Sequence, residues 1–186
     1  MTTIYFIRHA KSDFNVIDDR SRPLTEQGHV DCALVTEFLQ DKEIDVILSS
    51  PYKRAVDTIT GFARSVGKPI HTIEDLREIE HVLLDDWQPN VKNQWDDFSY
   101  SIPGNECLAD LQNRNIVALN DVLSRYENKN IVIGTHGMAL STIINFYDKS
   151  YGFDDFMNMV FINPWVAKMD FNGQECIAIE KIDLFD

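Results

Sequence analysis

Two adjacent residues near the start of the chain, Arg8 and His9, have side chains suited to phosphate chemistry. A guanidinium group donates hydrogen bonds in a planar fork that matches phosphate oxygens, and a neutral imidazole nitrogen can attack phosphorus. The residues just before them, 4–7, are β-branched or aromatic and predict a buried strand. The sequence therefore predicts an anion-binding and nucleophilic pair at the end of a strand.

Three more side chains with complementary chemistry follow later predicted strands, namely Arg54, Glu78 and His136. Because ligands of parallel sheets bind outside the carboxyl ends of the strands, we expect these side chains to gather at one edge with His9. Arg54 would then hold a phosphoryl group together with Arg8. His9 would act as the nucleophile, Glu78 as the acid for the leaving oxygen and His136 as a further hydrogen-bond donor.

The elements that must position these residues alternate between apolar runs and helical patterns. We predict strands over residues 4–7, 45–49, 68–73 and 131–135, helices after Thr25, from Ser50 to about Val66, after Gly104 and over 138–147, and a closing hairpin over 160–171 and 174–182. Such alternation favours an α/β fold whose mainly parallel sheet is covered on both faces, with a late antiparallel hairpin. In the first helix, the spacing of Val30, Leu34 and Phe38 predicts one buried face.

One long segment, residues 74–103, shows no clear periodicity. It is rich in acidic residues and contains the aromatic residues Trp87, Trp95, Phe98 and Tyr100. A segment of this length inside a compact domain is more often functional than merely connecting. We therefore predict one domain over residues 1–186 with a lid or specificity segment at about 74–103. We expect the aromatic side chains to pack this segment against the body of the domain.

The composition limits the possible partners. With 44% hydrophobic and 25% charged residues, the chain of 186 residues is typical of a soluble globular protein with a substantial core. The net charge of −13 disfavours nucleic acid or an anionic membrane as a partner. Three scattered cysteines and no apolar run long enough to span a bilayer favour a cytoplasmic location. No feature of the sequence indicates the oligomeric state.

An ordered set of short motifs resembles a known family. The first, Arg8-His9-Ala10-Lys11-Ser12 with Asn15, resembles the R-H-G-x-T-x-x-N motif of the histidine phosphatase superfamily, also called the phosphoglycerate mutase-like family. Further matches follow in the family's order at Pro23-Leu24-Thr25 with Gly28, Ser49-Ser50-Pro51 with Lys53-Arg54-Ala55 and Thr58, Leu76-Arg77-Glu78, Pro103-Gly104 with Glu106, and Thr135-His136-Gly137. The resemblance covers the chain from Ile4 to about Leu140, and the set is far more specific than one R-H pair.

This resemblance implies a three-layer α/β/α fold and catalysis without a metal or another cofactor. It implies that His9 is the residue phosphorylated during catalysis. It also implies that Arg8, Arg54 and His136 form the phosphate pocket.

Other roles are implied for the residues around this pocket. Ser12 and Asn15 would line the same loop, and Glu78 would donate the proton. Two departures from the family pattern bear on these roles. Ala10 replaces the glycine of the motif, so the backbone there must tolerate a Cβ. The stretch after Glu78 departs from the usual G-x-W-E-G, which leaves Glu80 as an alternative acid.

The function that we predict is a metal-independent phosphomonoesterase that acts on a small phosphorylated metabolite through a phosphohistidine intermediate. A phosphoglycerate mutase is an alternative, because Arg20 and Arg22 could hold the second acidic group of its substrate. The acidic 74–103 segment favours the phosphatase over the mutase. Another alternative is a module that binds a phosphorylated ligand without catalysis, which the presence of both His9 and His136 disfavours. No motif identifies the ester.

Overall fold

The structure is a computed structural model of the chain, and it describes residues 1–80, 87–101 and 103–185. Six strands of this described part form one sheet in the order β3-β2-β4-β1-β5-β6. In chain order the elements are β1 (Thr2–Arg8), α1 (Glu26–Leu39), β2 (Val46–Ser49), α2 (Lys53–Ser65), β3 (Ile70–Thr72), the 3-10 helix η1 (Glu74–Leu76), α3 (Trp87–Asp96), α4 (Leu108–Arg125), β4 (Asn130–Thr135), α5 (Gly137–Tyr147), α6 (Phe153–Met159), β5 (Trp165–Asn172) and β6 (Glu175–Asp183).

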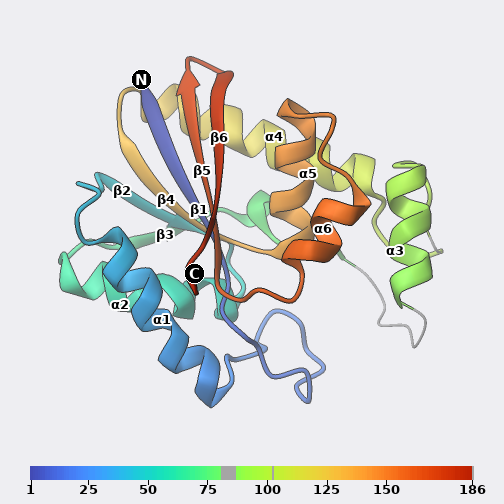
Figure 1. Cartoon of the computed structure of the whole chain (residues 1–186), viewed down its shortest axis with the longest axis horizontal. Coiled ribbons are helices and arrows are strands. Elements are labelled where there is room, and N and C mark those ends of the chain that lie inside the picture. The colour runs from blue at the N-terminus through green and yellow to red at the C-terminus, as the bar shows by residue number, and fades with distance from the viewer. Residues whose placement is uncertain (81–86, 102, 186) are drawn as a thin grey trace.

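Helices cover both faces of the sheet (Figure 1). Successive side chains of a strand point to opposite faces of the sheet. β1 is buried along its whole length, so its side chains join a hydrophobic core on each face. Ile4 and Phe6 join the core beneath α4, α5 and α6, whereas Tyr5 and Ile7 join the core beneath α1 and α2. The predicted three-layer α/β/α fold is confirmed.

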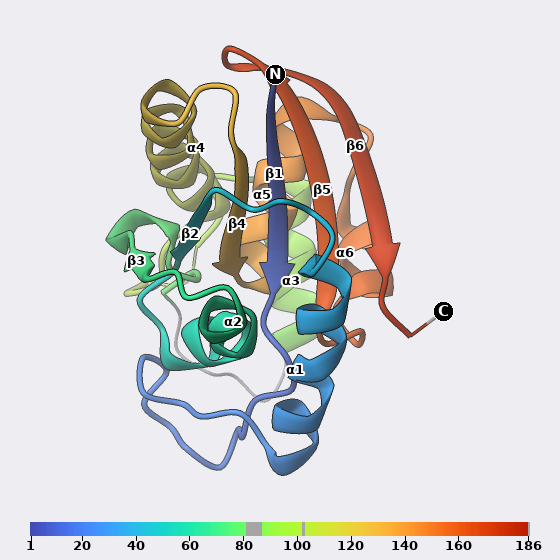
Figure 2. The ribbon, with the colours of Figure 1, turned by 90° about the vertical axis from the view of Figure 1, so that its left-hand side faces the viewer.

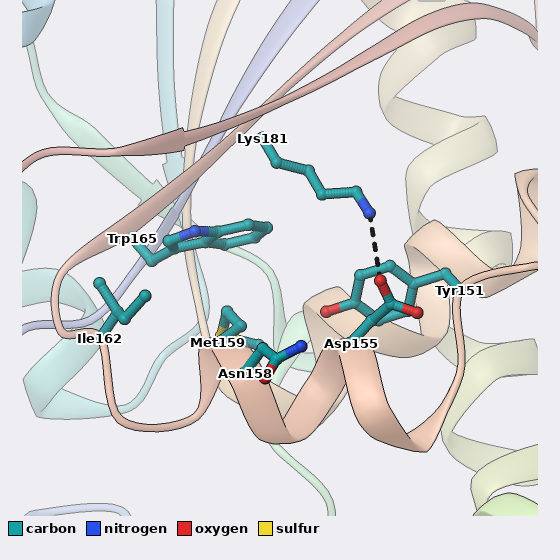
Figure 3. Close-up of a pocket in the computed structure, with 7 residues that line it drawn as sticks. All are labelled: Tyr151, Asp155, Asn158, Met159, Ile162, Trp165 and Lys181. Carbon is teal, nitrogen blue, oxygen red and sulfur yellow. Dashed lines mark hydrogen bonds and ion pairs between the residues drawn. The ribbon is translucent and has the colours of Figure 1, made fainter. Parts of the chain in front are cut away.

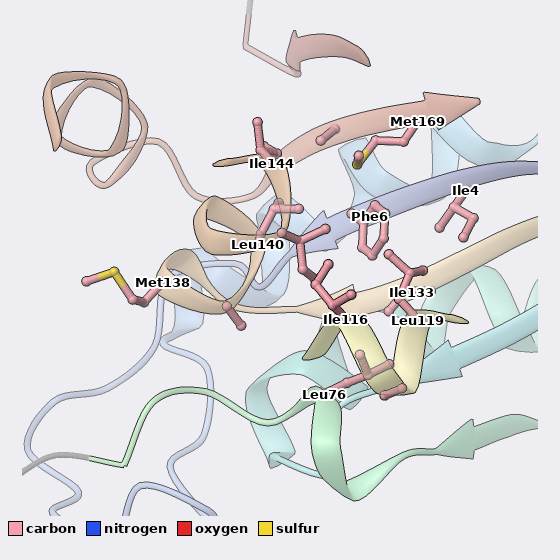
Figure 4. Close-up of a cluster of buried hydrophobic side chains, with 14 of the residues drawn as sticks. Ile4, Phe6, Leu76, Ile116, Leu119, Ile133, Met138, Leu140, Ile144 and Met169 are labelled. Carbon is pink, nitrogen blue, oxygen red and sulfur yellow. The ribbon is translucent and has the colours of Figure 1, made fainter. Parts of the chain in front are cut away.

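The larger of the two cores lies between the sheet and the helices α4 and α5 (Figure 4). Hydrophobic side chains from the strands and helices meet there, among them Phe6, Leu119, Ile133, Leu140, Ile144 and Met169. Most of these side chains are fully buried. Each buried side chain of this size contributes roughly 1.5–3 kcal/mol relative to its exposed state, so this packing fixes the strands that carry the candidate site.

The strand directions bring two predicted site residues together. Strands β1 to β4 run parallel in the sheet, and β5 and β6 form the predicted antiparallel hairpin. Arg8 at the end of β1 pairs in register with Thr135 at the end of β4. In Figure 2 the arrowheads of these two strands lie side by side near the loop that leads from β1 to α1. His9 and His136 therefore leave the sheet as neighbours.

Several predicted details differ from the structure. Helix α2 begins at Lys53 rather than directly after Ser50. The short helix α6 was not predicted. Val30 was expected on the buried face of α1 but is 65% exposed, and the helix buries Gly28, Val35 and Leu39 instead. The reason is the close approach of Gly28 to the loop after β1, which sets the rotation of the helix on the sheet.

The described part of the 74–103 segment packs through aromatic contacts, as predicted. Trp95 of α3 is buried, with its ring 5.5 Å from that of Phe98 and 6.1 Å from that of Phe156 in α6. Trp87, by contrast, is 40% exposed. His81, Asp85 and Asp86 of this segment lie outside the described residues. Over the described parts of the chain, no helix combines the length and the apolar character needed to cross a membrane.

Candidate active site

The imidazole of His9 is oriented by the backbone of the next residue. Its Nδ1 lies 2.7 Å from the carbonyl oxygen of Ala10. A carbonyl oxygen can only accept, so Nδ1 carries the hydrogen and Nε2 keeps its lone pair. The backbone N–H of His9 donates to the carbonyl of Thr135 over 3.0 Å, which ties the residue to the end of β4. His9 is therefore held in the tautomer in which Nε2 can act as a nucleophile.

Arg54 lies directly against this nitrogen. Its Nε donates to His9 Nε2 over 3.1 Å, and its side chain is buried. Arg54 sits in the first turn of α2, as predicted. Because an arginine nitrogen can only donate, this contact confirms the tautomer of His9 from the other side of the ring.

The two site histidines are neutral at physiological pH. Burial is the main cause that lowers the pKa of His9 well below its ordinary value, and the positive charges of Arg54 and Arg8 add to the effect. The pKa of His136 is lowered in the same way, by burial first and then by Arg54 and His9. The rings pack edge to face with centroids 5.3 Å apart. A neutral His9 is the form that can attack phosphorus.

The loop after β1 accommodates alanine where the family motif has glycine. Ala10 is fully buried and does not have a positive φ, so its Cβ causes no strain. Its N–H donates to Thr58 Oγ1 over 2.9 Å, and Thr58 in turn donates to the carbonyl of Arg54. Thr58 therefore joins the His9 loop to the helix that carries Arg54.

Gly28 fixes the same loop from the side of α1. A Cβ at this position would lie 2.2 Å from the carbonyl oxygen of Lys11, a distance that no side chain can adopt. The N–H of Thr25 donates to that oxygen over 2.9 Å, and the Thr25 hydroxyl caps α1 by accepting from the N–H of Gly28. The glycine thus permits the helix and the loop to touch.

His136 stands at the start of α5, as the predicted N-terminal position requires. Its Nε2 lies 2.7 Å from the hydroxyl oxygen of Ser50, and its ring packs against that of Tyr52 with centroids 5.2 Å apart. Its Nδ1 is buried and has no hydrogen-bond partner among the residues that the structure describes. The Ser50 hydroxyl accepts from the N–H of Tyr52, the N-cap of α2, over 3.2 Å and also orients this imidazole.

The carboxylate of Glu78 binds the N-terminal end of α5. Its Oε2 accepts from the N–H of Met138 over 3.0 Å, and its Oε1 accepts from the N–H groups of Ala139 and Ile79 over 2.9 and 3.0 Å. These contacts hold Glu78 one helical turn from His136. Oε2 accepts only one of them, so it retains a lone pair that can carry a proton.

Glu80 occupies a different environment. Its side chain is 61% exposed and pairs with Arg77 over 2.8 Å. The buried acid at the start of α5 is therefore Glu78, and the alternative acid Glu80 faces solvent.

Arg114 of α4, a residue with no predicted role, supports the Glu78 segment. Its guanidinium donates to the backbone carbonyls of Asp75, Arg77 and Glu78 over 2.8 to 2.9 Å. It also forms an ion pair of 2.6 Å with Glu106, a residue of the recognised motif set. A lone arginine inside a helical pattern gives no signal of this role, since its partners lie in a different segment.

Arg8 has a structural role in addition to the predicted one. Its Nη1 donates to the carbonyls of Met159 and Ile162 over 2.7 and 2.9 Å, and its Nη2 donates to the carbonyl of Val160 over 2.9 Å. These carbonyls lie at the C-terminal end of α6 and in the turn just after it. Burial lowers the pKa of the guanidinium to about 10, so it stays charged. Only its Nε remains without a partner.

The two residues predicted to line the loop differ in placement. Ser12 is buried, and its hydroxyl has no hydrogen-bond partner. Asn15 is exposed, and its side-chain amide donates to Asp13 over 2.8 Å. The structure therefore buries Ser12 in the loop after β1 and directs the Asn15 amide to a partner in its own loop.

A group of buried polar atoms at this edge of the sheet has no partner among the described residues. The atoms are Arg8 Nε, Ser12 Oγ, Thr135 Oγ1 and His136 Nδ1. Buried polar atoms are nearly always hydrogen-bonded, and an unpaired one costs about 1–3 kcal/mol. Three of these residues, Arg8, Thr135 and His136, lie at the ends of β1 and β4, where His9 also lies, and unpaired donors in such a place are suited to an oxyanion.

Two residues of the loop between β1 and α1 complete the charge distribution of the site, namely Asp19, which the sequence did not assign, and Arg22, which it named only for the mutase alternative. Asp19 lies on Arg54, with Oδ1 3.2 Å from Nη1 and Oδ2 3.3 Å from Nη2. The same Oδ1 is 2.6 Å from Nη1 of Arg22, which is also buried. Their loop shows no periodicity that could have predicted this pairing.

A separate cavity of about 190 Å³ lies beside α6 (Figure 3). Its walls are Tyr151, Asp155, Asn158, Met159, Ile162, Trp165 and Lys181. Lys181 pairs with Asp155 across it over 3.4 Å. His9 and Arg54 do not line this cavity, so it is distinct from the candidate site. The two adjoin at the α6 end, where Arg8 binds the carbonyls of Met159 and Ile162.

Comparisons with known proteins find relatives over most of the chain. The family model "Histidine phosphatase superfamily (branch 1)" matches residues 4–179. The chain is 25% identical over 193 residues to a putative phosphoserine phosphatase 2 of Hydrogenobacter thermophilus, covering 96% of the chain and 94% of the relative. It is 27% identical over 161 residues to a probable phosphoglycerate mutase of Proteus mirabilis, covering 78% and 74%. The solved structure of YhfR from Bacillus stearothermophilus superposes with a TM-score of 0.78 at 25% identity and covers 100% of both chains.

Proposed function

Because this chain belongs to the histidine phosphatase superfamily (branch 1), we propose that it hydrolyses phosphate monoesters of small metabolites through a phosphohistidine formed on His9. The observation that carries this proposal is the hydrogen bond from His9 Nδ1 to the carbonyl of Ala10. It leaves the Nε2 lone pair beside a buried arginine, which is what an attack on phosphorus requires.

The first step forms a bond between His9 Nε2 and phosphorus and breaks the bond to the ester oxygen. Arg54 Nε must release the Nε2 lone pair for this step, since it donates to that nitrogen at 3.1 Å. The transferring phosphoryl group then takes the hydrogen bonds of Arg54, Arg8 Nε and His136. The leaving oxygen receives a proton from Glu78, whose Oε2 has a lone pair to carry it.

The second step returns the enzyme to its starting state. A water molecule attacks the phosphohistidine, the bond between Nε2 and phosphorus breaks, and Glu78 takes up the proton that the water loses. Phosphate leaves, and His9 is again neutral. The protein's own cations supply the positive charge for both steps, so we propose that no metal takes part.

The test compares wild type with His9→Ala, and uses His71→Ala at an exposed position of β3 as the matched control. Substrates are p-nitrophenyl phosphate, phosphoserine and 3-phosphoglycerate, each with a chelator present. We expect wild type and His71→Ala to release phosphate at equal rates and His9→Ala to lose about 10³-fold or more in kcat. Equal turnover by His9→Ala would exclude His9 as the nucleophile.

A phosphoglycerate mutase is the second candidate, favoured by the buried Arg22 beside Arg54. The same assay separates the two functions. A mutase interconverts the 2- and 3-phosphoglycerates faster than it releases phosphate, whereas the proposed phosphatase releases phosphate without that exchange.

We further propose that the protein acts in the cytoplasm, which its three free cysteines support. The substrate is the proposed partner, and the net charge of −13 is unfavourable for nucleic acid or an anionic membrane. We also propose that the single domain uses residues 74–103 to select its substrate, since Glu78 lies within that segment.

A further inference from the structure

The carboxylate of Asp19 is shared between two buried arginines. It lies on both Nη atoms of Arg54 at 3.2 and 3.3 Å, and its Oδ1 lies 2.6 Å from Nη1 of Arg22. The side chains of Arg54 and Arg22 are only 4 and 5% exposed, whereas that of Asp19 is 34% exposed. A single partly exposed anion is therefore shared by two cations that solvent barely reaches.

This anion lies beside the nucleophile. The same guanidinium that binds Asp19 through its Nη atoms donates through its Nε to His9 Nε2 over 3.1 Å. The three nitrogens of a guanidinium are fixed in one plane, so an oxyanion that takes donors from Asp19 is bound by the same rigid group that contacts the attacking nitrogen. Two anions cannot share these donors without strong repulsion.

From this geometry we propose that Asp19 is an internal counter-anion that the phosphoryl group displaces, and that Arg22 is a further arginine of the phosphate pocket. This proposal rests on the proposed function. It adds to the pocket the cation Arg22 and the anion Asp19, which competes with the phosphoryl group, and the family motifs include neither residue. In the absence of substrate, Asp19 keeps the buried arginines paired. When the phosphoryl group binds, it takes the Nη donors of Arg54 and Arg22 that the Asp19 carboxylate releases.

The loop that carries Asp19 permits such a displacement. Arg22 anchors the loop independently, because its Nε donates to the carbonyl of Val16 over 3.0 Å. On the solvent-exposed side of the loop, Arg20 forms a bidentate ion pair with Glu74. Among the described residues, the carboxylate of Asp19 is bound by the two arginines alone, and its backbone carbonyl accepts from Arg54 Nη1 over 2.6 Å. The side chain can therefore rotate outward while the backbone contact holds the loop in place.

The first experiment measures binding of inorganic phosphate by calorimetry, without turnover. Asp19→Asn keeps the size of the side chain and removes its charge, and Asp18→Asn makes the same charge change at an exposed neighbour that bonds to Ser21. We expect Asp19→Asn to bind phosphate about tenfold more tightly than wild type, which is about 1.4 kcal/mol. Asp18→Asn should match wild type within about twofold. An affinity of Asp19→Asn equal to or weaker than that of Asp18→Asn would overturn the proposal.

The second experiment tests Arg22 in the Asp19→Asn background. Adding Arg22→Gln should cancel the gain in phosphate affinity, whereas adding Arg20→Gln at the exposed pair with Glu74 should keep it. A double variant with Arg22→Gln that binds as tightly as Asp19→Asn would remove Arg22 from the pocket. Thermal melts of each variant show whether a loss of affinity reflects unfolding.

A third measurement does not depend on any variant. In a crystal structure of the wild-type protein with inorganic phosphate, the Asp19 carboxylate should lie more than about 4 Å from the Arg54 guanidinium, beyond ion-pair distance. A carboxylate still on Arg54 beside bound phosphate would overturn the proposal. If no ester is hydrolysed but Asp19→Asn gains phosphate affinity, only the proposed function fails. If wild type hydrolyses esters and Asp19→Asn gains nothing, only this inference fails.

Discussion

The imidazole of His9 is held at both nitrogens before any substrate binds, by the Ala10 carbonyl on one side and by Arg54 Nε on the other. The carbonyl orients the ring, and the arginine prevents it from taking up a proton. Both contacts fit a group that must be neutral and correctly aimed when a phosphoryl group arrives. The alanine at position 10 does not disturb this, since the contact uses only its backbone.

The depressed pKa values of the two histidines predict how stability depends on pH. In the unfolded chain a histidine takes up a proton as the pH falls through about 6.5, whereas folded His9 and His136 do so only well below their ordinary pKa. Protonation therefore favours the unfolded state below pH 6.5. Each histidine should lower the free energy of unfolding by up to about 1.4 kcal/mol per pH unit in that window, and the contribution is absent above it.

Denaturant unfolding at a series of pH values from 7.5 down to 5 checks this expectation, with His136→Asn compared with wild type. The variant should lose stability less steeply below pH 6.5, by about 1.4 kcal/mol per unit. His71→Gln, which is exposed on β3, should keep the wild-type slope. If the free energy of unfolding fell equally steeply with pH in wild type and His136→Asn, His136 would have the same pKa in the folded and the unfolded chain, which would contradict this expectation.

At the scale of elements, the site is built from helix ends. Glu78 occupies the N–H groups at the start of α5, and Arg8 occupies the carbonyls at the end of α6. Charges of these signs also suit the dipoles of the helices. The positive end of α5 is therefore used to hold the acid, and the phosphoryl group relies on the side chains of Arg54, Arg8 and His136.

The placement of Glu78 on α5 predicts a dependence on the leaving group. Glu78→Gln cannot donate a proton to the leaving oxygen, so alkyl phosphates should react about 10²- to 10⁴-fold more slowly. p-Nitrophenyl phosphate has a leaving group that needs no proton, and we expect it to lose less than about tenfold. Loss of the Glu78 contacts at the start of α5 would slow both esters equally, so the ratio of the two rates isolates the effect on proton donation. Glu80→Gln at the exposed position serves as control. A uniform loss on both esters would assign the acid to another residue.

The sequence predicted the elements whose pattern is local. Each of β1, β2 and β4 is an apolar run, and the parallel order of their carboxyl ends was enough to predict that Arg54 and His136 meet His9. Helix α6 was missed because it has only seven residues and a helix that short is marginal by itself. Its C-terminal end depends on Arg8, which precedes it by about 150 residues in the chain.

The pairing of Asp19 with Arg22 and Arg54 could not be predicted for a similar reason. The path of the loop between β1 and α1 follows no period, so the sequence cannot tell which of its charges point inward. The same holds for Asn15, whose amide the motif implied for the site but which bonds to Asp13. The resemblance identified the motif residues, whereas the internal counter-charge became visible only in the structure.

At the scale of the whole molecule, a positive pocket lies in a strongly negative protein. The net charge of −13 repels a phosphate dianion at long range, and Asp19 reduces the local attraction further. Raising the ionic strength from about 0.01 to about 0.15 M shortens the screening length from about 30 to about 8 Å. We expect kcat/KM to rise several-fold with added sodium chloride, while kcat, which starts from bound substrate, changes little. A fall in kcat/KM would show that the local arginines dominate the approach of the substrate.

The position of β4 in the sheet has a consequence for how the protein is made. This strand separates β1 from β2, although both precede it in the chain. A growing chain that has emerged only as far as residue 129 therefore has no middle strand, and its first two strands have nothing to join them. Pairing across such a distance is slow, and the exposed edges on each side of the gap favour wrong partners while it lasts. The catalytic edge of the sheet forms only when β4 pairs with β1 and β2. A chain stalled before that point exposes unpaired strand edges that chaperones can bind.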